Sequence, residues 1–345
     1  MKTIRDVAKL AGVSASTAGR VIGNYGSVSE TARKKVLDAV QILNYHPNAI
    51  AQSMRNHSSK TIAVVIGSIM NNFFSEITYV IERIARRKGY NVLICNTHEK
   101  KNLEIQQLEL LYSKHIDGII LASAFEEKKE IPERNLYLYG GEIPLVCIDR
   151  SIKGLDIDLI ETEHFHGAYE ATRYLIGLGH QKIAVIGSGN PATSTVKIRM
   201  SGYKKALEES RIEFNKNRLL SIDYEKEVAQ KEISSFFDKN TDITAVLVLN
   251  NSLCSGILKE LKKRNLSIPD DVSFIGWDDE ALNQLLNITT EEQQIQKIGK
   301  LAAERIFYLI ESPKARGEHM VTTLKPHLII RDSCKKIVID NRKVL

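Results

Sequence analysis

After residue 60 the chain alternates short runs of β-branched residues with longer helical patterns, and this alternation limits the fold more than any other feature. The predicted strands form two series, one at 61–66, 91–95, 118–121 and 145–148, and one at 182–186, 219–222, 245–249 and 272–275. Helical patterns lie between them, for example at 74–88, 167–178 and 252–264. Such alternation is typical of parallel sheets covered by helices.

The two series begin alike, with Ile62-Ala-Val-Val-Ile-Gly67 in the first and Ile183-Ala-Val-Ile-Gly187 in the second. This similarity predicts an α/β core of two similar parallel-sheet lobes. Ligands of open parallel sheets bind beyond the carboxyl ends of the strands. We therefore expect a ligand cleft between two lobes that face each other.

Positive charge is concentrated at the amino terminus. The first 60 residues carry nine basic and three acidic side chains, a balance of +6 that equals the formal net charge of all 345 residues. The rest of the chain is therefore neutral overall. A small basic head on a neutral body is typical of a nucleic-acid binder that has a second, separate function.

Within this head, residues 4–23 contain two short helical patterns that meet at Gly12-Val13-Ser14. Glycine tolerates the left-handed backbone of a tight turn, and serine is a preferred residue at the start of a helix. A third helix is predicted to start at Ser29 and to end before residues 45–47. The pattern favours a helix-turn-helix whose second helix enters the major groove of DNA. A basic helical bundle without a DNA role is the alternative.

Three segments carry a specific resemblance: Thr3-Ile-Arg-Asp-Val-Ala, Val28-Ser-Glu-Thr-Ala-Arg and Leu43-Asn-Tyr-His-Pro-Asn. They closely resemble the lactose-repressor (LacI/GalR) family, and family-like segments recur down to Arg331-Asp332-Ser333. The resemblance implies an all-α helix-turn-helix domain followed by a core like that of periplasmic binding proteins. The implied divisions are 1–46 for the DNA-binding domain, 47–60 for a hinge helix and linker, 61–331 for the core and 332–345 for a tail. Within the core, lobe one is 61–159 plus 290–320, and lobe two is 160–289 plus 321–331.

The resemblance also assigns DNA-binding positions in the head. Ala15 and Ser16 match the variable base-reading pair of the recognition helix, and Arg20 matches a base-contacting arginine. Guanidinium can bond to guanine with two hydrogen bonds. Thr3 and Ser29 match positions that contact phosphates at helix N-termini.

A hinge helix that folds on DNA and inserts an apolar side chain into the minor groove is implied for residues 48–55, with Asn48, Ala51 and Met54 as contacts. This chain departs from the family pattern at Met54, where leucine is usual, and at Ala18-Gly19, where Val-Ser is usual. Methionine is more flexible than leucine, and a glycine inside a helix costs roughly 1 kcal/mol relative to alanine. Both departures bear on the affinity for the operator.

Candidate effector-binding residues follow the predicted strands or match the family's cleft positions. Most are planar amide, carboxylate or guanidinium groups that can bridge the hydroxyls of a sugar, and the aromatic ones could stack on its apolar face. They are Asn71, Phe73, Phe74, Asp149, Arg150, Arg199, Tyr224, Asn250, Asp278 and Gln293. Asn251 stands where the family has an aspartate.

The favoured function is a DNA-binding transcriptional repressor that acts as a homodimer on a palindromic operator and responds to a sugar or sugar acid. A nucleobase, a nucleoside or a protein could instead be the effector, and activation could replace repression. A sugar-transport binding protein and a two-domain α/β enzyme are the competing classes. The basic head and the absence of a secretory signal disfavour the first, and the lack of a catalytic motif disfavours the second. A cytoplasmic location is expected.

Three further signals are weaker. Gly187-Ser-Gly-Asn-Pro lacks the last glycine of a dinucleotide fingerprint. His164 and His166 beside Glu161 and Glu163 could suggest a metal site, but a surface cluster is the favoured interpretation. No cofactor, metal or membrane span is expected. The four cysteines are far apart and indicate buried or idle thiols: Cys95, Cys147, Cys254 and Cys334.

Overall fold

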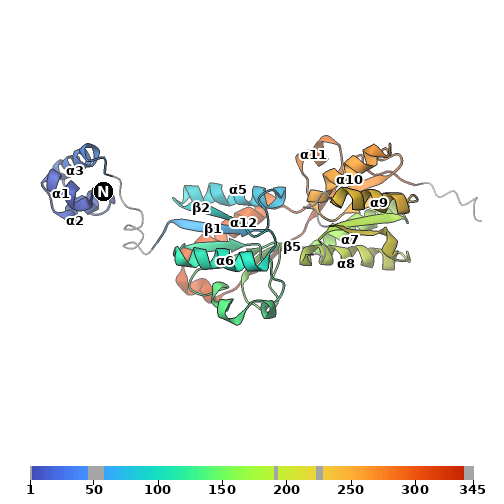
Figure 1. Ribbon diagram of the computed structural model, residues 1–345, viewed down its shortest axis with the longest axis horizontal. Helices are drawn as coiled ribbons and strands as arrows, with labels where there is room; N and C mark the ends of the chain where they lie inside the picture. Colours follow the sequence, from blue (N-terminus) through green and yellow to red (C-terminus); the bar gives the residue numbers. More distant parts are fainter. Residues whose placement is uncertain (1, 46–57, 190–192, 223–227, 338–345) are drawn as a thin grey trace, which may run out of the picture. The chain divides into compact units, whose positions relative to one another are not determined.

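The computed structural model describes residues 2–45, 58–189, 193–222 and 228–337. The chain divides into two compact units, residues 1–60 and 61–345 (Figure 1). The hinge positions Asn48, Ala51 and Met54 lie outside the described residues, and so do Tyr224 and the tail from 338 onward.

The head is a bundle of three helices, α1 (Ile4–Ala11), α2 (Ala15–Ile22) and α3 (Glu30–Ile42). Gly12 ends α1 with a φ of +65°, and the Ser14 side chain accepts a hydrogen bond from the Thr17 amide at the start of α2. Ser29 caps α3 in the same way. The small buried side chains Val7, Ala8, Ala11, Ala18, Val21, Val36 and Ala39 form its core. The predicted helix-turn-helix is confirmed.

The first lobe of the core contains a sheet in the order β11-β5-β4-β3-β1-β2, in which all neighbours are parallel. Its strands are β1 (Thr61–Ile66), β2 (Asn91–Asn96), β3 (Gly118–Leu121), β4 (Leu145–Ile148), β5 (Asp158–Thr162) and β11 (Val321–Leu324). Its helices are α5 (Asn72–Arg87), α6 (Lys101–Ser113) and α12 (Ile295–Glu311), with short turns η1 (Lys128–Glu130), η2 (Glu133–Leu138) and η4 (Pro313–Gly317).

The second lobe has a sheet in the order β12-β10-β9-β8-β6-β7, parallel except between β10 and β12. Its strands are β6 (Ile183–Ser188), β7 (Leu219–Ile222), β8 (Ala245–Val248), β9 (Ser273–Trp277), β10 (Thr289–Glu292) and β12 (His327–Ile329). Its helices are α7 (His164–Gly177), α8 (Ser194–Glu209), α9 (Val228–Lys239), α10 (Asn251–Lys263) and α11 (Ala281–Leu285), with turn η3 (Lys216–Arg218).

Helices cover both faces of each sheet, so successive residues of a strand enter different cores. Along β1, Ile62 and Val64 pack with α5 and α12, while Ala63 and Val65 pack with α6. The same division occurs along β6, whose residues alternate between clusters that contain α7 and α8 on one side and α9 and α10 on the other. Burial on both faces explains the unbroken apolar runs in the sequence. The predicted α/β core of two parallel-sheet lobes is confirmed.

The boundaries of the lobes differ from those expected at three segments, each of which lies where the chain passes from one lobe to the other. Residues 160–162 of β5 and 321–324 of β11 pair in the first sheet, and residues 290–292 of β10 pair in the second. The chain therefore changes lobe after each strand and not before it. The strands β5, β10, β11 and β12 were not predicted because their short runs contain several polar residues and lack the apolar signature of a strand buried on both faces.

The close contact between α7 and α8 depends on Gly202. A Cβ atom at this position would lie 2.2 Å from the Phe165 carbonyl oxygen and 3.0 Å from the Tyr169 amide nitrogen. Backbone atoms cannot yield to it, so Gly202→Ala is expected to destabilise the core by about 1–3 kcal/mol. Thermal unfolding measures this loss. The control is Gly177→Ala, where a Cβ atom meets nothing within 4 Å. Equal stability of the two variants would contradict the prediction.

Among the described residues, no helix is both long and apolar enough to cross a membrane.

Candidate functional site

Two aspartates mark corresponding places in the two lobes. Asp149 directly follows β4, and Asp278 directly follows β9. Their φ angles are +70° and +63°, in the left-handed region that residues other than glycine rarely adopt. Both side chains are buried. Strained backbone and buried carboxylates at the carboxyl ends of parallel strands are typical of a binding site.

Arg199 of α8 lies at the centre of the polar cluster that these aspartates border. Its guanidinium carbon is 4.1 Å from the centroid of the Trp277 ring. Nη1 donates to the Leu249 carbonyl oxygen at 2.7 Å, and Nη2 donates to Gln293 Oε1 at 3.2 Å. Gln293 in turn donates to Asp278 Oδ1 at 2.7 Å. Arg199 is thereby held with only 4% of its surface exposed.

His164, the first residue of α7, connects this cluster to the first lobe. Its Nδ1 atom is 3.3 Å from Arg199 Nε and 3.1 Å from Nη2. Because a guanidinium can only donate, Nδ1 accepts, and the ring proton is on Nε2. Nε2 then donates to the Asp149 carbonyl oxygen at 3.2 Å. The expectation that His164 belongs to a surface cluster is wrong, because the start of α7 packs inward and leaves this side chain only 3% exposed.

Arg150 extends the cluster within the first lobe. It donates to both carboxylate oxygens of Glu99, at 2.8 and 3.2 Å, and to Asp149 at 3.2 Å. These contacts join the loop after β2 to the loop after β4. We call the set of Glu99, Asp149, Arg150, His164, Arg199, Asp278 and Gln293 the interlobe network.

The network shifts the pKa values of its two aspartates in opposite directions. Burial opposes ionisation of Asp149, but the hydrogen bond from His164 and the charges of Arg150 and Arg199 outweigh it and hold its pKa well below the usual value. Burial raises the pKa of Asp278 to about 7, against the opposing effects of Arg199 and Gln293. Burial also lowers the pKa of Arg199 to about 10. Such divergence is typical of functional sites.

Of the predicted effector residues, Asp149, Arg150, Arg199, Asp278 and Gln293 are in this network. Asn71 caps α5 and contacts Asn251 of the second lobe at 2.8 Å, while Asn250 caps α10. Phe73 and Phe74 belong to the core of the first lobe, each only 4% exposed, with their rings edge to face. The prediction that they stack on a sugar is therefore not supported by their placement: the first turn of α5 packs them onto the sheet.

Four residues of the site were missed or undervalued by sequence reasoning: Glu99, His164, Asn251 and Trp277. Glu99 follows the predicted strand 91–95 by only four residues, and Trp277 directly precedes Asp278, so proximity to a strand end could have signalled both. The place of His164 depends on β5, which the polar sequence conceals. Asn251 was noticed only as a departure from a family pattern.

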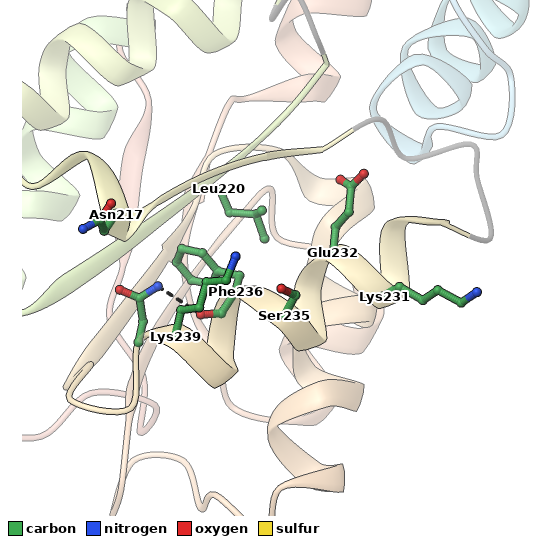
Figure 2. A pocket seen from close by; sticks show the side chains of 8 residues that line it. Asn217, Leu220, Lys231, Glu232, Ser235, Phe236 and Lys239 are labelled. Atoms are coloured by element: carbon green, nitrogen blue, oxygen red, sulfur yellow. Dashed lines mark hydrogen bonds between the residues drawn. The ribbon is translucent and has the colours of Figure 1, made fainter.

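A pocket of about 610 Å³ lies elsewhere in the second lobe (Figure 2). It is lined by α9 and by residues near β7: Asn217, Leu220, Lys231, Glu232, Ser235, Phe236, Lys239 and Asn240. Most of its polar side chains are exposed, and Asn240 donates to the Phe236 carbonyl oxygen at 3.0 Å. It shares no residue with the interlobe network. The network, with its buried charges, is the better candidate for selective binding.

In the head, Ala15, Ser16 and Arg20 of α2 are exposed, whereas Ala18 and Gly19 of the same helix are buried. Thr3 and Ser29 cap α1 and α3, so each stands at a helix N-terminus. Helix N-termini favour anions such as phosphate groups.

The cysteines are free thiols, and burial raises the pKa of all four, to about 12 for Cys254. Within the described part of the chain, no three potential ligands of the His, Cys, Asp and Glu types gather into a metal site.

Two family models match the chain. Residues 3–48 match the model described as bacterial regulatory proteins, lacI family. Residues 59–332 match the model of periplasmic binding proteins and the sugar binding domain of the LacI family. The first match covers the helix-turn-helix, and the second covers both lobes of the core.

Similar proteins include HTH-type transcriptional repressors named PurR. That of Histophilus somni (strain 2336) is 31% identical over 339 residues, covering 98% of this chain and 100% of the repressor. That of Vibrio vulnificus is 33% identical over 344 residues, with the same coverage of each.

Solved structures are also similar. The lac repressor dimer bound to operator and the anti-inducer ONPF has a TM-score of 0.82 at 23% identity, covering 97% of this chain and 99% of that one. A LacI family regulator from Enterococcus faecium with bound ribose has a TM-score of 0.68 at 26% identity, covering 81% and 100%. The chain therefore belongs to the LacI family of bacterial regulatory proteins and is a DNA-binding transcriptional regulator.

Proposed function

We propose that the protein is a cytoplasmic repressor that binds a palindromic operator as a homodimer, and that a small polar effector bound at the interlobe network controls this binding. The observation that carries the proposal is the hydrogen-bonded path from Asp149 through His164, Arg199 and Gln293 to Asp278. The bond from His164 to the Asp149 carbonyl oxygen crosses between the lobes, so an effector that replaces it changes the contact between the lobes. Effector and operator binding are then coupled, by typically ~1–3 kcal/mol in allosteric proteins.

A sugar or sugar acid suits the network best. Its side chains are carboxylates, an amide and guanidinium groups, which can accept from and donate to adjacent hydroxyls. Arg199 makes its hydrogen bonds to neutral acceptors and acts on Asp149 and Asp278 through space, so an acidic group can compete for its charge. The nearby rings of Phe73, Phe74 and Trp277 are buried, so recognition of either a sugar or a nucleobase falls to the polar groups of the network. The ribose-bound relative at 26% identity supports the same class.

A nucleobase is the second candidate effector. It is favoured by the relatives named PurR, a name that denotes a purine response. The polar edges of a purine could use the same aspartate and arginine groups.

Thermal unfolding of the purified chain with sugars, sugar acids, sugar phosphates and nucleobases tests the proposal. A ligand at 100 times its Kd should add about 2.7 kcal/mol of stability. A single stereospecific sugar as the hit supports the carbohydrate class, and a purine base supports the second candidate. No stabilisation by any compound would contradict control by a small molecule of these classes.

The head makes a separate prediction. Arg20→Lys keeps the positive charge but loses the two-pronged guanidinium, so binding to the selected operator should weaken by about 1–3 kcal/mol. The loss should fall on one base pair of each half-site. The slope of log Kd against log salt should stay unchanged, because the charge is kept. Fluorescence anisotropy with single-base operator variants measures both. A uniform loss on all sequences would show that Arg20 contacts only the phosphate backbone.

A further inference from the structure

The buried side chain of Asn251 forms a partly buried hydrogen-bonded bridge between the two lobes. It is the first residue of α10, and 6% of its surface is exposed. Its Nδ2 atom donates to Asn71 Oδ1 of the first lobe at 2.8 Å and to Glu280 Oε1 of its own lobe at 2.8 Å. An amide nitrogen carries two hydrogens, so each acceptor can receive one.

The identities of both acceptor atoms are fixed, that of Asn71 by its other hydrogen bond and that of Glu280 by the chemistry of a carboxylate. Asn71 caps α5, where its Oδ1 atom also accepts from the Phe73 amide at 3.0 Å. An Oδ1–Nδ2 exchange at Asn71 would break this cap, so the atom that faces Asn251 is an oxygen. Glu280 presents a carboxylate oxygen. Position 251 must therefore supply two N–H groups, which an asparagine can do and an ionised aspartate cannot.

This requirement accounts for the departure noted in the sequence, where asparagine replaces the aspartate of the family pattern. An aspartate here would place a carboxylate against the Glu280 carboxylate and the Asn71 oxygen.

The bridge also limits which hydrogen bonds the Asn71 side chain can make to an effector. Its carbonyl oxygen has two lone pairs, and Phe73 and Asn251 use both. Only the two hydrogens of its Nδ2 atom remain, so Asn71 can offer a bound effector donors but no acceptor.

A second interlobe contact lies nearer the solvent. Lys197 Nζ is 3.0 and 2.9 Å from the two carboxylate oxygens of Glu126. The side chains are 51% and 35% exposed, so water and salt screen this ion pair. The bond from Asn251 to Asn71 joins two neutral amides and is partly buried, so salt does not screen it in the same way. It is therefore less sensitive to salt than the ion pair.

We propose that Asn251 is a positioning and specificity-determining residue: it holds Asn71 and the start of α5 against the second lobe, and it restricts Asn71 to donating to the effector. The part about the effector rests on the proposed function, whereas the bridge does not.

The test compares Asn251→Asp with Asn287→Asp, which adds the same charge at an exposed position of the same lobe. Hydrogen exchange of the full chain is followed in peptides that cover residues 71–75 and 252–260. Loss of the bridge should speed exchange at residues 71–75 about tenfold in Asn251→Asp and leave it unchanged in the control. Asn251→Ala, which removes the donors without adding charge, should behave like Asn251→Asp and serves if that variant does not fold.

Faster exchange confined to residues 252–260 would mean that Asn251 only supports its own helix, and this result would overturn the bridge. The specificity is tested by calorimetry with D-ribose, D-gluconate and hypoxanthine. Weaker binding of one compound to Asn251→Asp and Asn251→Ala, with unchanged binding to Asn287→Asp, supports the role in recognition. Binding that is equal in all variants overturns that role alone. If none of the three compounds binds the wild type but exchange at residues 71–75 is faster in Asn251→Asp, the part about the effector is overturned. The bridge is then still supported.

Discussion

Replacing Arg199 by alanine is expected to lower the free energy of unfolding by about 3–5 kcal/mol, because three buried acceptors each lose their donor at a cost of roughly 1–3 kcal/mol. The substitution removes the bonds to Leu249, His164 and Gln293 together with the contact to the Trp277 ring. It also removes the positive charge that favours the ionised forms of Asp149 and Asp278. Chemical denaturation monitored by circular dichroism gives the size of the loss.

Arg199→Lys is the matched variant. Lysine keeps the charge but cannot donate to the same set of acceptors or cover the indole in the same way. The free energy of unfolding of Arg199→Lys should therefore lie between those of wild type and Arg199→Ala. Effector-induced stabilisation should disappear in both variants. A loss below about 1 kcal/mol in Arg199→Ala would mean that the network does not depend on this guanidinium.

Glu291→Gln is expected to remove a pH-dependent loss of stability on the order of 4 kcal/mol. Glu291 is 1% exposed, and its Oε2 atom lacks a hydrogen-bond partner in the described structure. Burial raises its pKa to about 8, with Glu170 and Glu292 acting in the same direction and Arg199 and Lys325 against it. One unit of pKa difference corresponds to about 1.36 kcal/mol.

The sign follows from where the protons are bound. The unfolded chain has its ordinary glutamate pKa of 4.5, so between that pH and about 8 the folded protein binds the extra proton. Stability therefore falls as pH rises through this window, and the loss is complete above about 8. Glutamine cannot ionise, so the stability of the variant minus that of wild type should rise from pH 5 to 8. The pKa of Asp278 is raised to about 7, so Asp278 also causes stability to fall with rising pH, by a smaller amount, in both wild type and Glu291→Gln.

Glu304→Gln is the control for this prediction, because Glu304 is exposed on α12. Its difference from wild type should be small over the same pH range. A difference between Glu291→Gln and wild type that does not change with pH would contradict a buried, protonated Glu291.

The main elements of the fold could be predicted because their physical signals are local. Strands buried on both faces, such as β1 and β6, are continuous apolar runs. The head has its turn glycine, its cap serines and its spacing of small apolar residues within 45 residues. By contrast, β5 and β10 are polar strands at the crossings between lobes. Their pairing depends on the assembled sheets, so their sequences carry no comparable signal.

The site could be predicted only in part for the same reason. Asp149 lies directly after a predicted strand and Asp278 lies three residues after one, where ligands of such sheets bind. The burial of Phe73 and Phe74 depends on how α5 packs on its sheet, and the contact between Asn71 and Asn251 joins residues 180 positions apart. The spacing of residues within one segment of the chain predicts neither this burial nor this contact.

In the proposed function, one small molecule acts through the interlobe network on DNA binding. Selection of double-stranded DNA by the purified full chain, followed by anisotropy of the selected fragment with each compound of the panel, tests it most directly. We expect a palindromic site whose Kd changes about 5–150-fold with one compound in wild type and not in Arg199→Lys. Selection of a palindrome whose Kd no compound changes, or changes equally in both proteins, would contradict it.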